Sequence, residues 1–553
     1  MSALAPVQSA HPQPSGPAHL VGLARRVPAW TITAAFALAY LIVAPASPDL
    51  AAASYRSSLF SSAGFTLWDN SWYGGHHLLA YSVLAPALGA LIGPQPLAAI
   101  SMVIATALFA RLIDGCFPAG AARIAAAWFA VGASVALLSS RVPFDLGLAI
   151  GLGAVLAARR ARLPAALALS VLTSLASPVA GAFLALAFLT WALAGPRRAW
   201  PSALTVAALA PVVLLALAFP EGGAQPFVAS AFYPELAGVL AIGMLIEPDR
   251  SRAPQRLLRI GAALYALALV GSYALPTAVG GNSDRLGALA AGPIAACALA
   301  GASRGRRRAL LVLAPFLLYW QANAPVADYA AAASDPSVNA SYYTPLLREL
   351  RALDVGYGSP PMRPVRIEVV ATADHWEARW LAPHVMIARG WERQLDTYRN
   401  GLFYEESRPL TAARYRAWLS QNAISYVALP DAPLDYSAKA EARLVRAGPP
   451  YLHEVWRSAH WRLFTVRAAT ALASPPAVLR GASSDSLTLY APRAGYYTVR
   501  VRFTPYWALA SGSGCVSRAL GGWTELQARK AGELHVVIRF SLARVFDHGT
   551  RCD

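Results

Sequence analysis

Long apolar runs recur over the first 325 residues of the chain, and short polar loops separate them. A helix needs roughly 20 apolar residues to cross a membrane perpendicularly, and several of these runs are shorter. Ser177-Pro178 interrupts one apolar stretch that is basic at both ends, so we interpret it as two short helices, with a re-entrant pair as the alternative. The runs predict eleven membrane segments, at about 28–47, 95–112, 121–139, 144–158, 163–176, 178–195, 200–219, 233–247, 257–275, 285–303 and 308–324.

The composition agrees with this pattern. Of the 553 residues, 56% are hydrophobic and only 14% are charged, whereas soluble proteins carry about 25% charged residues. The net charge of +18 would suggest a nucleic-acid partner in a soluble protein. Here most arginines of the apolar half lie in short loops, where they set orientation, so we expect a polytopic α-helical membrane protein and no nucleic acid.

Arginines cluster in alternate loops, at residues 25–26, 111–123, 159–162, 197–198, 250–259 and 304–308. The intervening loops contain Arg56, Arg141 and Arg285 as their only arginines. The positive-inside rule makes the first set of loops cytoplasmic. An odd number of spans then predicts a cell-membrane protein with a cytoplasmic N-terminus and an extracytoplasmic tail.

The pattern also divides the chain into domains. Residues 1–27 are rich in Pro and Ser and are expected to form a disordered cytoplasmic N-terminus without a cleavable signal peptide. Residues 28–325 form the transmembrane domain, with a long outer loop at 48–94. "RPVRIEVV" and "AISYVALP" predict strands and "LTAARYRAWLSQNA" a helix, so 326–470 is expected to be an α/β domain. Alternating residues in "SLTLYAPRAGYYTVRVRF" and "ELHVVIRFS" predict a β-sandwich over 471–553.

The outer loops gather the polar chemistry. "FTLWDNSWYGGHH", residues 65–77, places acidic, aromatic and histidine side chains just after the first apolar segment. Asp49 and Asp145 lie close to the membrane boundary, where a charge is costly and often functional. The alternative is that acidic residues are found in the outer loops simply because arginines are concentrated in the inner ones.

Several motifs and their order resemble the GT-C superfamily of membrane glycosyltransferases. The motifs are "WDNSWYGGH" with "LLAYSVLAPALGALIG" after it, then "RVPFDLGLAIGLG", "ASPVAGAFLAL" and "GGNSDRLGALAAGP". The chain is most similar to YfhO-type and related uncharacterised actinobacterial branches. The resemblance implies an inverting transfer, on the outer face, of a sugar from a polyprenyl-phosphate donor to a cell-envelope glycan, lipid or protein. Most members of the superfamily work without a metal, so none is expected, although a divalent ion stays open.

The resemblance assigns the acids. Asp49 matches the acid that follows the first helix, so it is the candidate base that deprotonates the acceptor hydroxyl; its alternative role is to solvate a helix end after Pro48. Asp69 is the second candidate acid, or a ligand for a sugar hydroxyl, and its alternative is a turn residue.

Arg141 and Arg285 each open a membrane segment on the outer side and are candidate ligands for the lipid phosphate. The alternatives are snorkelling at a helix end or pairing with Asp145 and Asp284. We expect Asp145 to pair with one of these arginines.

Aromatic and histidine residues complete the candidate substrate site. Trp68, Trp72 and Tyr73 suit a sugar, or form an interfacial belt. His76 and His77 are candidates for binding a phosphate or for acid/base chemistry, and such a pair is more often structural.

Two further segments are of interest. The loop "FPEGGAQPFVASAFYPE", 219–235, is either a lid or a plain connector. In the tail, "ADHWEARW" and "ARGWERQLDTYRN" gather aromatic and polar residues that suit a glycan, or form an ordinary packed surface.

The four cysteines leave one question open. Cys116 and Cys297 lie in or beside apolar segments and are expected to be inert. Cys515 and Cys552 lie in the tail, where an extracytoplasmic location permits a disulfide, so a bridge and two free thiols are both open.

Two other functions are carried as alternatives. An envelope-lipid or glycan transporter or flippase would place charges at mid-membrane and often shows inverted repeats. A non-catalytic scaffold would have a filled outer cavity. The outer charges and the dissimilar halves favour an enzyme.

Overall fold

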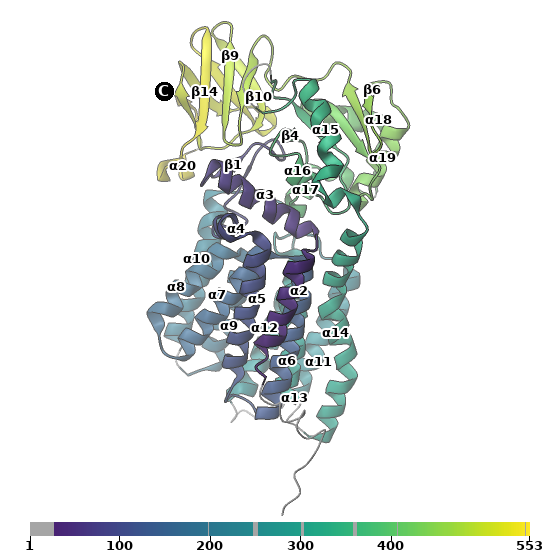
Figure 1. The fold of residues 1–553 in the computed structure, drawn as a ribbon. Coiled ribbons are helices and arrows are strands. Elements are labelled where there is room, and N and C mark those ends of the chain that lie inside the picture. Colours follow the sequence, from purple (N-terminus) through teal and green to yellow (C-terminus); the bar gives the residue numbers. More distant parts are fainter. Residues whose placement is uncertain are drawn as a thin grey trace, which may run out of the picture.

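The computed structural model describes residues 27–196, 198–246, 253–299, 303–357, 362–405, 407–547 and 549–552. A bundle of helices forms one end of the molecule, and a tail with two β-containing domains forms the other (Figure 1). The bundle helices are α2 (Trp30–Val43), α5 (Pro94–Ile113), α6 (Ala119–Ala136), α7 (Val142–Arg159), α8 (Leu163–Ala176), α9 (Pro178–Ala194), α10 (Ala199–Ala218), α11 (Ala229–Leu245), α12 (Ala253–Ala274), α13 (Asp284–Leu299) and α14 (Arg304–Ala333).

Each predicted membrane segment overlaps one of these helices. Within the described residues, six helices are long and apolar enough to cross a membrane, or seven if the bent pair α2 and α3 counts as one span. The helices α8, α9 and α11 are apolar but shorter. The chain is therefore helical with several candidate spans, and the number of eleven crossings stays a prediction.

The outer loop 48–94 contains more regular structure than the sequence predicted. Helix α3 (Pro48–Ala63) follows α2 at an angle of 74° and lies between the bundle and the tail (Figure 1). Its N-terminus is well defined, because the Ser47 hydroxyl accepts a hydrogen bond from the Leu50 amide at 3.3 Å and Pro48 occupies the first turn. Beyond it lie the short strands β1 (Trp68–Asp69) and β2 (His76–His77) and the helix α4 (Ala85–Ile92).

Helix α14 starts at the end of the bundle farthest from the tail and runs up to it, past the predicted boundary at residue 325 (Figure 1). The arginines at 304–308 therefore lie at the far end, as the positive-inside assignment requires. Which side of a membrane that end faces stays a prediction.

The first tail domain is a mixed α/β unit. Its sheet has the order β4-β3-β5-β7-β6, in which β3 pairs in parallel with β4 and β5, and β7 pairs antiparallel with β5 and β6. The strands are β3 (Arg366–Val369), β4 (Met386–Ile387), β5 (Ile424–Pro430), β6 (Leu452–Arg457) and β7 (Trp461–Val466). The helices are α15 (Ala340–Ala352), α16 (Glu377–Trp380), α17 (Arg393–Arg399), α18 (Ala412–Gln421) and α19 (Lys439–Arg446).

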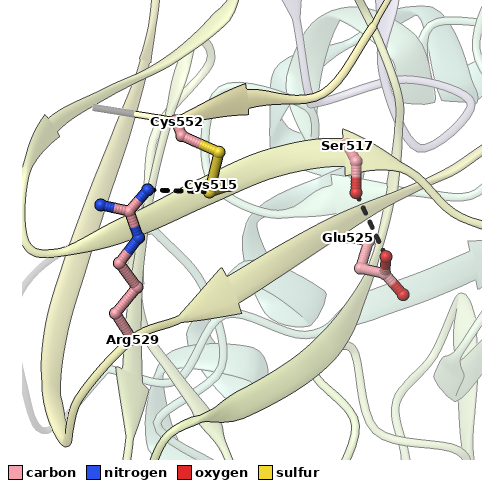
Figure 2. The surroundings of a disulfide bond; sticks show 5 residues. All are labelled: Cys515, Ser517, Glu525, Arg529 and Cys552. Atoms are coloured by element: carbon pink, nitrogen blue, oxygen red, sulfur yellow. Dashed lines mark hydrogen bonds between the residues drawn. A yellow bond between two sulfur atoms is a disulfide. The ribbon is translucent and has the colours of Figure 1, made fainter.

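The second tail domain has two antiparallel sheets, of order β10-β13-β12-β15 and β11-β14-β9-β8, around one apolar core. The strands are β8 (Val478–Ala482), β9 (Ser486–Ala491), β10 (Gly495–Arg502), β11 (Trp507–Ser511), β12 (Gly514–Arg518), β13 (Trp523–Ala528), β14 (Gly532–Ile538) and β15 (Arg551–Cys552), with α20 (Leu542–Phe546) before the last. A disulfide between Cys515 and Cys552 ties β15 to β12, which answers the question that the sequence left open (Figure 2).

Candidate functional site

A cavity of about 820 Å³ lies where the bundle meets the tail. The N-terminal turn of α3, the start of α7, the loop after α10, the start of α13, the upper part of α14 and tail residues 391–394 form its walls. Charged side chains are concentrated in this lining: Asp49, Arg141, Glu221, Glu235, Asp284, Arg285, Asp328, Glu392 and Arg393. The candidate base Asp49 and both candidate phosphate ligands, Arg141 and Arg285, are among them.

Asp49 and Arg141 form an ion pair in this cavity. The Arg141 Nε lies 3.3 Å from Asp49 Oδ2, and the Asp49 side chain remains 28% exposed. Asp49 lies in the first turn of α3, where the unpaired backbone amides of a helix favour a negative charge. The carboxylate is thus paired with a guanidinium and is still accessible from the cavity.

Arg285 enters the cavity from the second residue of α13. Its guanidinium lies 5.6 Å from the centre of the Phe144 ring, and no ion pair involves it within the described part of the chain. A guanidinium without a carboxylate partner has its forked donors available for a phosphate.

The remaining acids of the bundle differ in their surroundings. Asp284 accepts a hydrogen bond from the Trp320 indole, and Asp328 accepts one from the Ser139 hydroxyl at 2.6 Å. Asp145 is buried and does not line the large cavity; it lies in an adjoining pocket of about 40 Å³ with Arg141 and Arg285. Within the described residues Asp145 has no ion pair, so the direct pairing expected from the sequence is not present.

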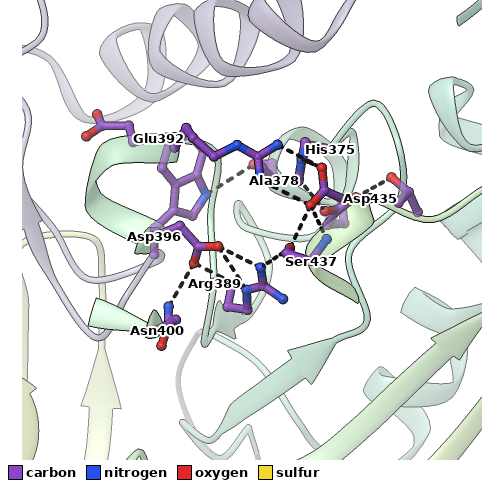
Figure 3. A network of polar contacts seen from close by, with 12 residues as sticks. His375, Ala378, Arg389, Glu392, Asp396, Asn400, Asp435 and Ser437 are labelled. Carbon is purple, nitrogen blue, oxygen red and sulfur yellow. Dashed lines mark hydrogen bonds and ion pairs between the residues drawn. The ribbon is translucent and has the colours of Figure 1, made fainter. Parts of the chain in front are cut away.

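The tail contributes one wall of the cavity. Trp391 is packed between the His375 ring, with centroids 3.8 Å apart, and the Arg393 guanidinium, 4.8 Å from its centre. Arg393 and His375 both contact Asp435, at 2.7 and 3.3 Å (Figure 3). This network fixes the segment 391–394 within the tail domain.

Glu392 ties that wall to α3. Its carboxylate forms an ion pair with Arg56, whose guanidinium also lies 4.1 Å from the centre of the Tyr81 ring. Burial raises the pKa of Glu392 to about 7, and the Arg56 charge opposes that rise.

The cluster at 65–77 lies behind the cavity. Among its candidates, Trp68, Asp69, Trp72, Tyr73, His76 and His77 are all buried, and none appears in the cavity lining. Asp69 accepts hydrogen bonds from the Tyr55 hydroxyl and the Ser71 amide, both at 2.9 Å, and burial raises its pKa to about 6. These contacts are those of a structural turn residue, the alternative that the sequence left open.

The two histidines have different surroundings. His76 stacks on Trp72 with centroids 5.4 Å apart, neither ring nitrogen has a hydrogen-bond partner in the described chain, and burial lowers its pKa to about 3. His77 Nδ1 lies 2.8 Å from Glu221, and its Nε2 lies 3.0 Å from the Thr504 hydroxyl. Neither ring faces the cavity, so neither is placed to contact a substrate there.

Glu221 joins the cluster to the cavity loop. Besides His77, it pairs with Arg399 of α17 at 2.8 Å, and these charges lower its pKa against the effect of burial. The Gln225 amide donates to the Thr277 carbonyl at 2.9 Å. The loop 219–228 is thus held at two points over the cavity, which suits a fixed wall better than a lid.

Sequence reasoning missed Asp328 as a cavity residue. The predicted last span ended at 324, but α14 continues to Ala333 and carries Asp328 into the cavity. Pro325 lies inside this helix directly after the predicted end, at a position where a proline usually ends a helix. Within the described residues, no three His, Cys, Asp or Glu side chains are grouped to hold a metal ion.

Comparison with known proteins gives structural likeness only. No protein-family model and no curated protein matches the chain. A mutant form of the arabinofuranosyltransferase AftD from Mycobacteria aligns with 14% identity and a TM-score of 0.42, over 93% of this chain and 60% of that one. A second AftD structure gives 13% identity and a TM-score of 0.40, over 93% of this chain and 57% of that one. The oligosaccharyltransferase AglB from Archaeoglobus fulgidus, in complex with an inhibitory peptide and a dolichol-phosphate, aligns with 13% identity and a TM-score of 0.37. This alignment covers 73% of this chain and 69% of that one. The chain thus spans about 60% of the first of these structures.

Proposed function

We propose that this chain is a membrane glycosyltransferase that transfers a sugar from a polyprenyl-phosphate donor to a cell-envelope acceptor. The observation that carries the proposal is the accessible Asp49 carboxylate in a cavity that also contains Arg141 and Arg285. A base beside two guanidiniums, between apolar helices and a polar tail, suits a substrate with a lipid tail, a phosphate and a sugar.

The reaction assigns a role to each group. Asp49 accepts the proton of the acceptor hydroxyl as its oxygen attacks the anomeric carbon of the donor sugar. The bond between that carbon and the phosphate oxygen breaks, and prenyl phosphate leaves with the bonding electron pair. Arg285, with Arg141 beside it, stabilises the charge on the departing phosphate. Attack from the face opposite the phosphate inverts the anomeric centre.

The ion pair with Arg141 serves the base in a second way. The Arg141 guanidinium holds the Asp49 carboxylate in place at the cavity wall, where it remains accessible to an acceptor hydroxyl. Because the cavity lies at the tail end of the bundle, the transfer takes place on the outer face if the positive-inside assignment is correct.

The cavity also discriminates among the alternatives. A scaffold descended from an enzyme would be expected to fill its site, whereas this cavity holds about 820 Å³ of open space. A transporter would carry its charged groups at the middle of the bundle. The charged lining here is confined to the end next to the tail, which favours the enzyme over both.

The test compares a deletion strain complemented with wild type and with Asp49→Asn. Mass spectrometry would follow lipid-linked sugars and envelope glycans. We expect a prenyl-phosphate sugar to accumulate, and one glycan to lose a residue, in both the deletion and the Asp49→Asn strains. Full restoration of the glycan by Asp49→Asn would show that Asp49 is not the base.

A further inference from the structure

A second cavity, of about 910 Å³, lies on the opposite side of α3. Leu50, Ser54, Ser57, Ser58 and Ser61 line it, a spacing that follows one face of a helix. Asp49 and Ala52 point to the first cavity from the other face. Helix α3 is therefore a wall between two cavities of similar size, and we call the second one the serine groove.

The serine groove differs in chemistry from the first cavity. Arg379 is the one charged residue in its described lining, and no carboxylate is present there. The serines of α3, Gln95 and Asn339 line the groove together with the tail residues Trp376 and Trp380. Neutral donors and acceptors opposite aromatic rings are the combination that suits a carbohydrate.

Two tryptophans form the aromatic part of the serine groove: Trp380 at the end of α16 and Trp376 directly before that helix. Trp376 and Trp380 stack with centroids 5.8 Å apart and an interplanar angle of 22°. The Trp380 indole donates to the Val338 carbonyl at 3.1 Å, and the Arg379 guanidinium lies 4.8 Å from the centre of its ring. Trp380 is thus held in a fixed orientation while remaining partly exposed.

Trp376 adds an independent observation. It is only 7% exposed, and its indole N–H has no hydrogen-bond partner within the described residues. A buried donor without a partner is costly unless something else satisfies it. Trp376 is also part of the groove wall, so this unpaired donor belongs to a side chain that lines the groove.

We propose that the serine groove binds an oligosaccharide, namely the part of the acceptor glycan remote from the reacting hydroxyl. A sugar ring stacks on Trp380, while Arg379 and the serines of α3 hydrogen-bond its hydroxyls. Assigning this glycan as the acceptor rests on the proposed glycosyl transfer; binding of an oligosaccharide does not. A phospholipid is the competing occupant, because Val43 and Tyr329 line the end of the groove next to the bundle.

The test uses native mass spectrometry of the full chain in nanodiscs of phosphatidylglycerol and phosphatidylethanolamine. The probe is the pool of oligosaccharides released by mild acid from the envelope of the source organism. The mass of each adduct distinguishes a bound glycan from a bound lipid. We expect a glycan adduct with wild type.

The matched variants are Ser61→Trp and Ser62→Trp. Both serines are exposed neighbours near the end of α3, but only Ser61 lines the groove. We expect Ser61→Trp to weaken glycan binding about tenfold or more and Ser62→Trp to leave it unchanged. Trp380→Ala should weaken it similarly, and thermal unfolding would show whether that variant is folded. Since Ser61→Trp removes no core contact, it tests the groove even if Trp380→Ala does not fold.

The outcomes separate this inference from the proposed function. Asp49→Asn should retain the glycan adduct while losing transfer, because Asp49 faces the other cavity. Absence of any glycan adduct with wild type, equal binding by Ser61→Trp, or a phospholipid adduct that only Ser61→Trp removes would each overturn the inference. Glycan binding by a wild-type chain that shows no transfer activity would overturn the proposed function alone.

Discussion

Trp68 and Trp72 lie four residues apart in the chain but belong to two different hydrophobic cores. Trp68 packs edge-on against Trp507 in the β-sandwich, with centroids 6.1 Å apart. Trp72 stacks on Tyr55 of α3 at 4.5 Å within the core of the α/β domain, and its indole donates to the Ala378 carbonyl. The polar, aromatic stretch after the first helix therefore joins both tail domains to the bundle and supports the wall of the cavity.

Removing either tryptophan should loosen the tail. Trp68→Ala and Trp72→Ala each leave a large cavity in a core, and we expect about 3–5 kcal/mol of lost stability. Phe65 is a matched control in the same stretch, because it is 60% exposed. Phe65→Ala should leave the unfolding midpoint in denaturant unchanged. Equal midpoints for all three variants would contradict the joining role.

The two acids proposed as bases can be separated by substitution. Asp49→Asn should lower the transfer rate by about 10²–10⁴-fold, the usual contribution of a general base. Asp69→Asn should stay within about tenfold of wild type, since Asp69 lies outside the cavity and an amide oxygen can still accept one of its hydrogen bonds. The measurement is transfer from a prenyl-phosphate sugar in isolated membranes. The reverse order of the two variants would make Asp69 the base.

Arg285 should matter for the donor phosphate. Arg285→Gln removes the guanidinium without breaking an ion pair of the described chain, and we expect donor binding to weaken by about 10–100-fold, as for a lost hydrogen bond to a charged group. Arg123, exposed near the start of α6, is the control, and Arg123→Gln should bind the donor normally. Binding of undecaprenyl phosphate in nanodiscs measures the effect. Unchanged affinity in Arg285→Gln would remove Arg285 from the site.

The apolar runs and the alternating segments of the sequence predicted most of the fold. Each apolar run contains a helix, "RPVRIEVV" and "AISYVALP" contain β3 and β5, and the alternating C-terminal segments form the sandwich. Asp49, Arg141 and Arg285 line the cavity, and the sequence pointed to them because a charge at the edge of an apolar run is conspicuous and because Asp49 matches the acid of the family that the chain resembles. These patterns are local, so they can be recognised in the sequence without knowledge of the tertiary structure.

The features that could not be predicted from the sequence depend on contacts between segments far apart in the chain. Helix α3 has alanines and serines where an apolar stripe would be expected, and it forms because tail residues far along the chain cover it. Whether Trp72 faces a ligand or a core is decided by Ala378 and its neighbours, some 300 residues away. Asp49 and Asp145 both lie near a predicted membrane boundary in the sequence, and only packing places Asp49 in the cavity and Asp145 in the small pocket beside it.

His76 should make the fold sensitive to acid. Its pKa is lowered to about 3 in the folded chain, mainly by burial and further by Arg56, Arg399 and His77, whereas Glu221 opposes the change. In the unfolded chain a histidine titrates near 6.5. The unfolded state therefore binds the proton first, so stability is fully present above about pH 6.5 and is lost as the pH falls toward 3. The limiting slope is about 1.4 kcal/mol per pH unit for this group.

Substitution by phenylalanine isolates this contribution. His76→Phe keeps a ring on Trp72 and removes two nitrogens that have no hydrogen-bond partner in the described chain. We expect it to match wild type at pH 7.5 and to be more stable by about 1 kcal/mol at pH 5.5. Because Asp69 and Glu392 titrate in both proteins, the difference between their urea unfolding curves reports His76 alone. His77→Phe is the contrasting variant: it loses the contacts to Glu221 and Thr504 and should be less stable at pH 7.5. A constant difference between wild type and His76→Phe across this pH range would contradict a neutral, buried His76.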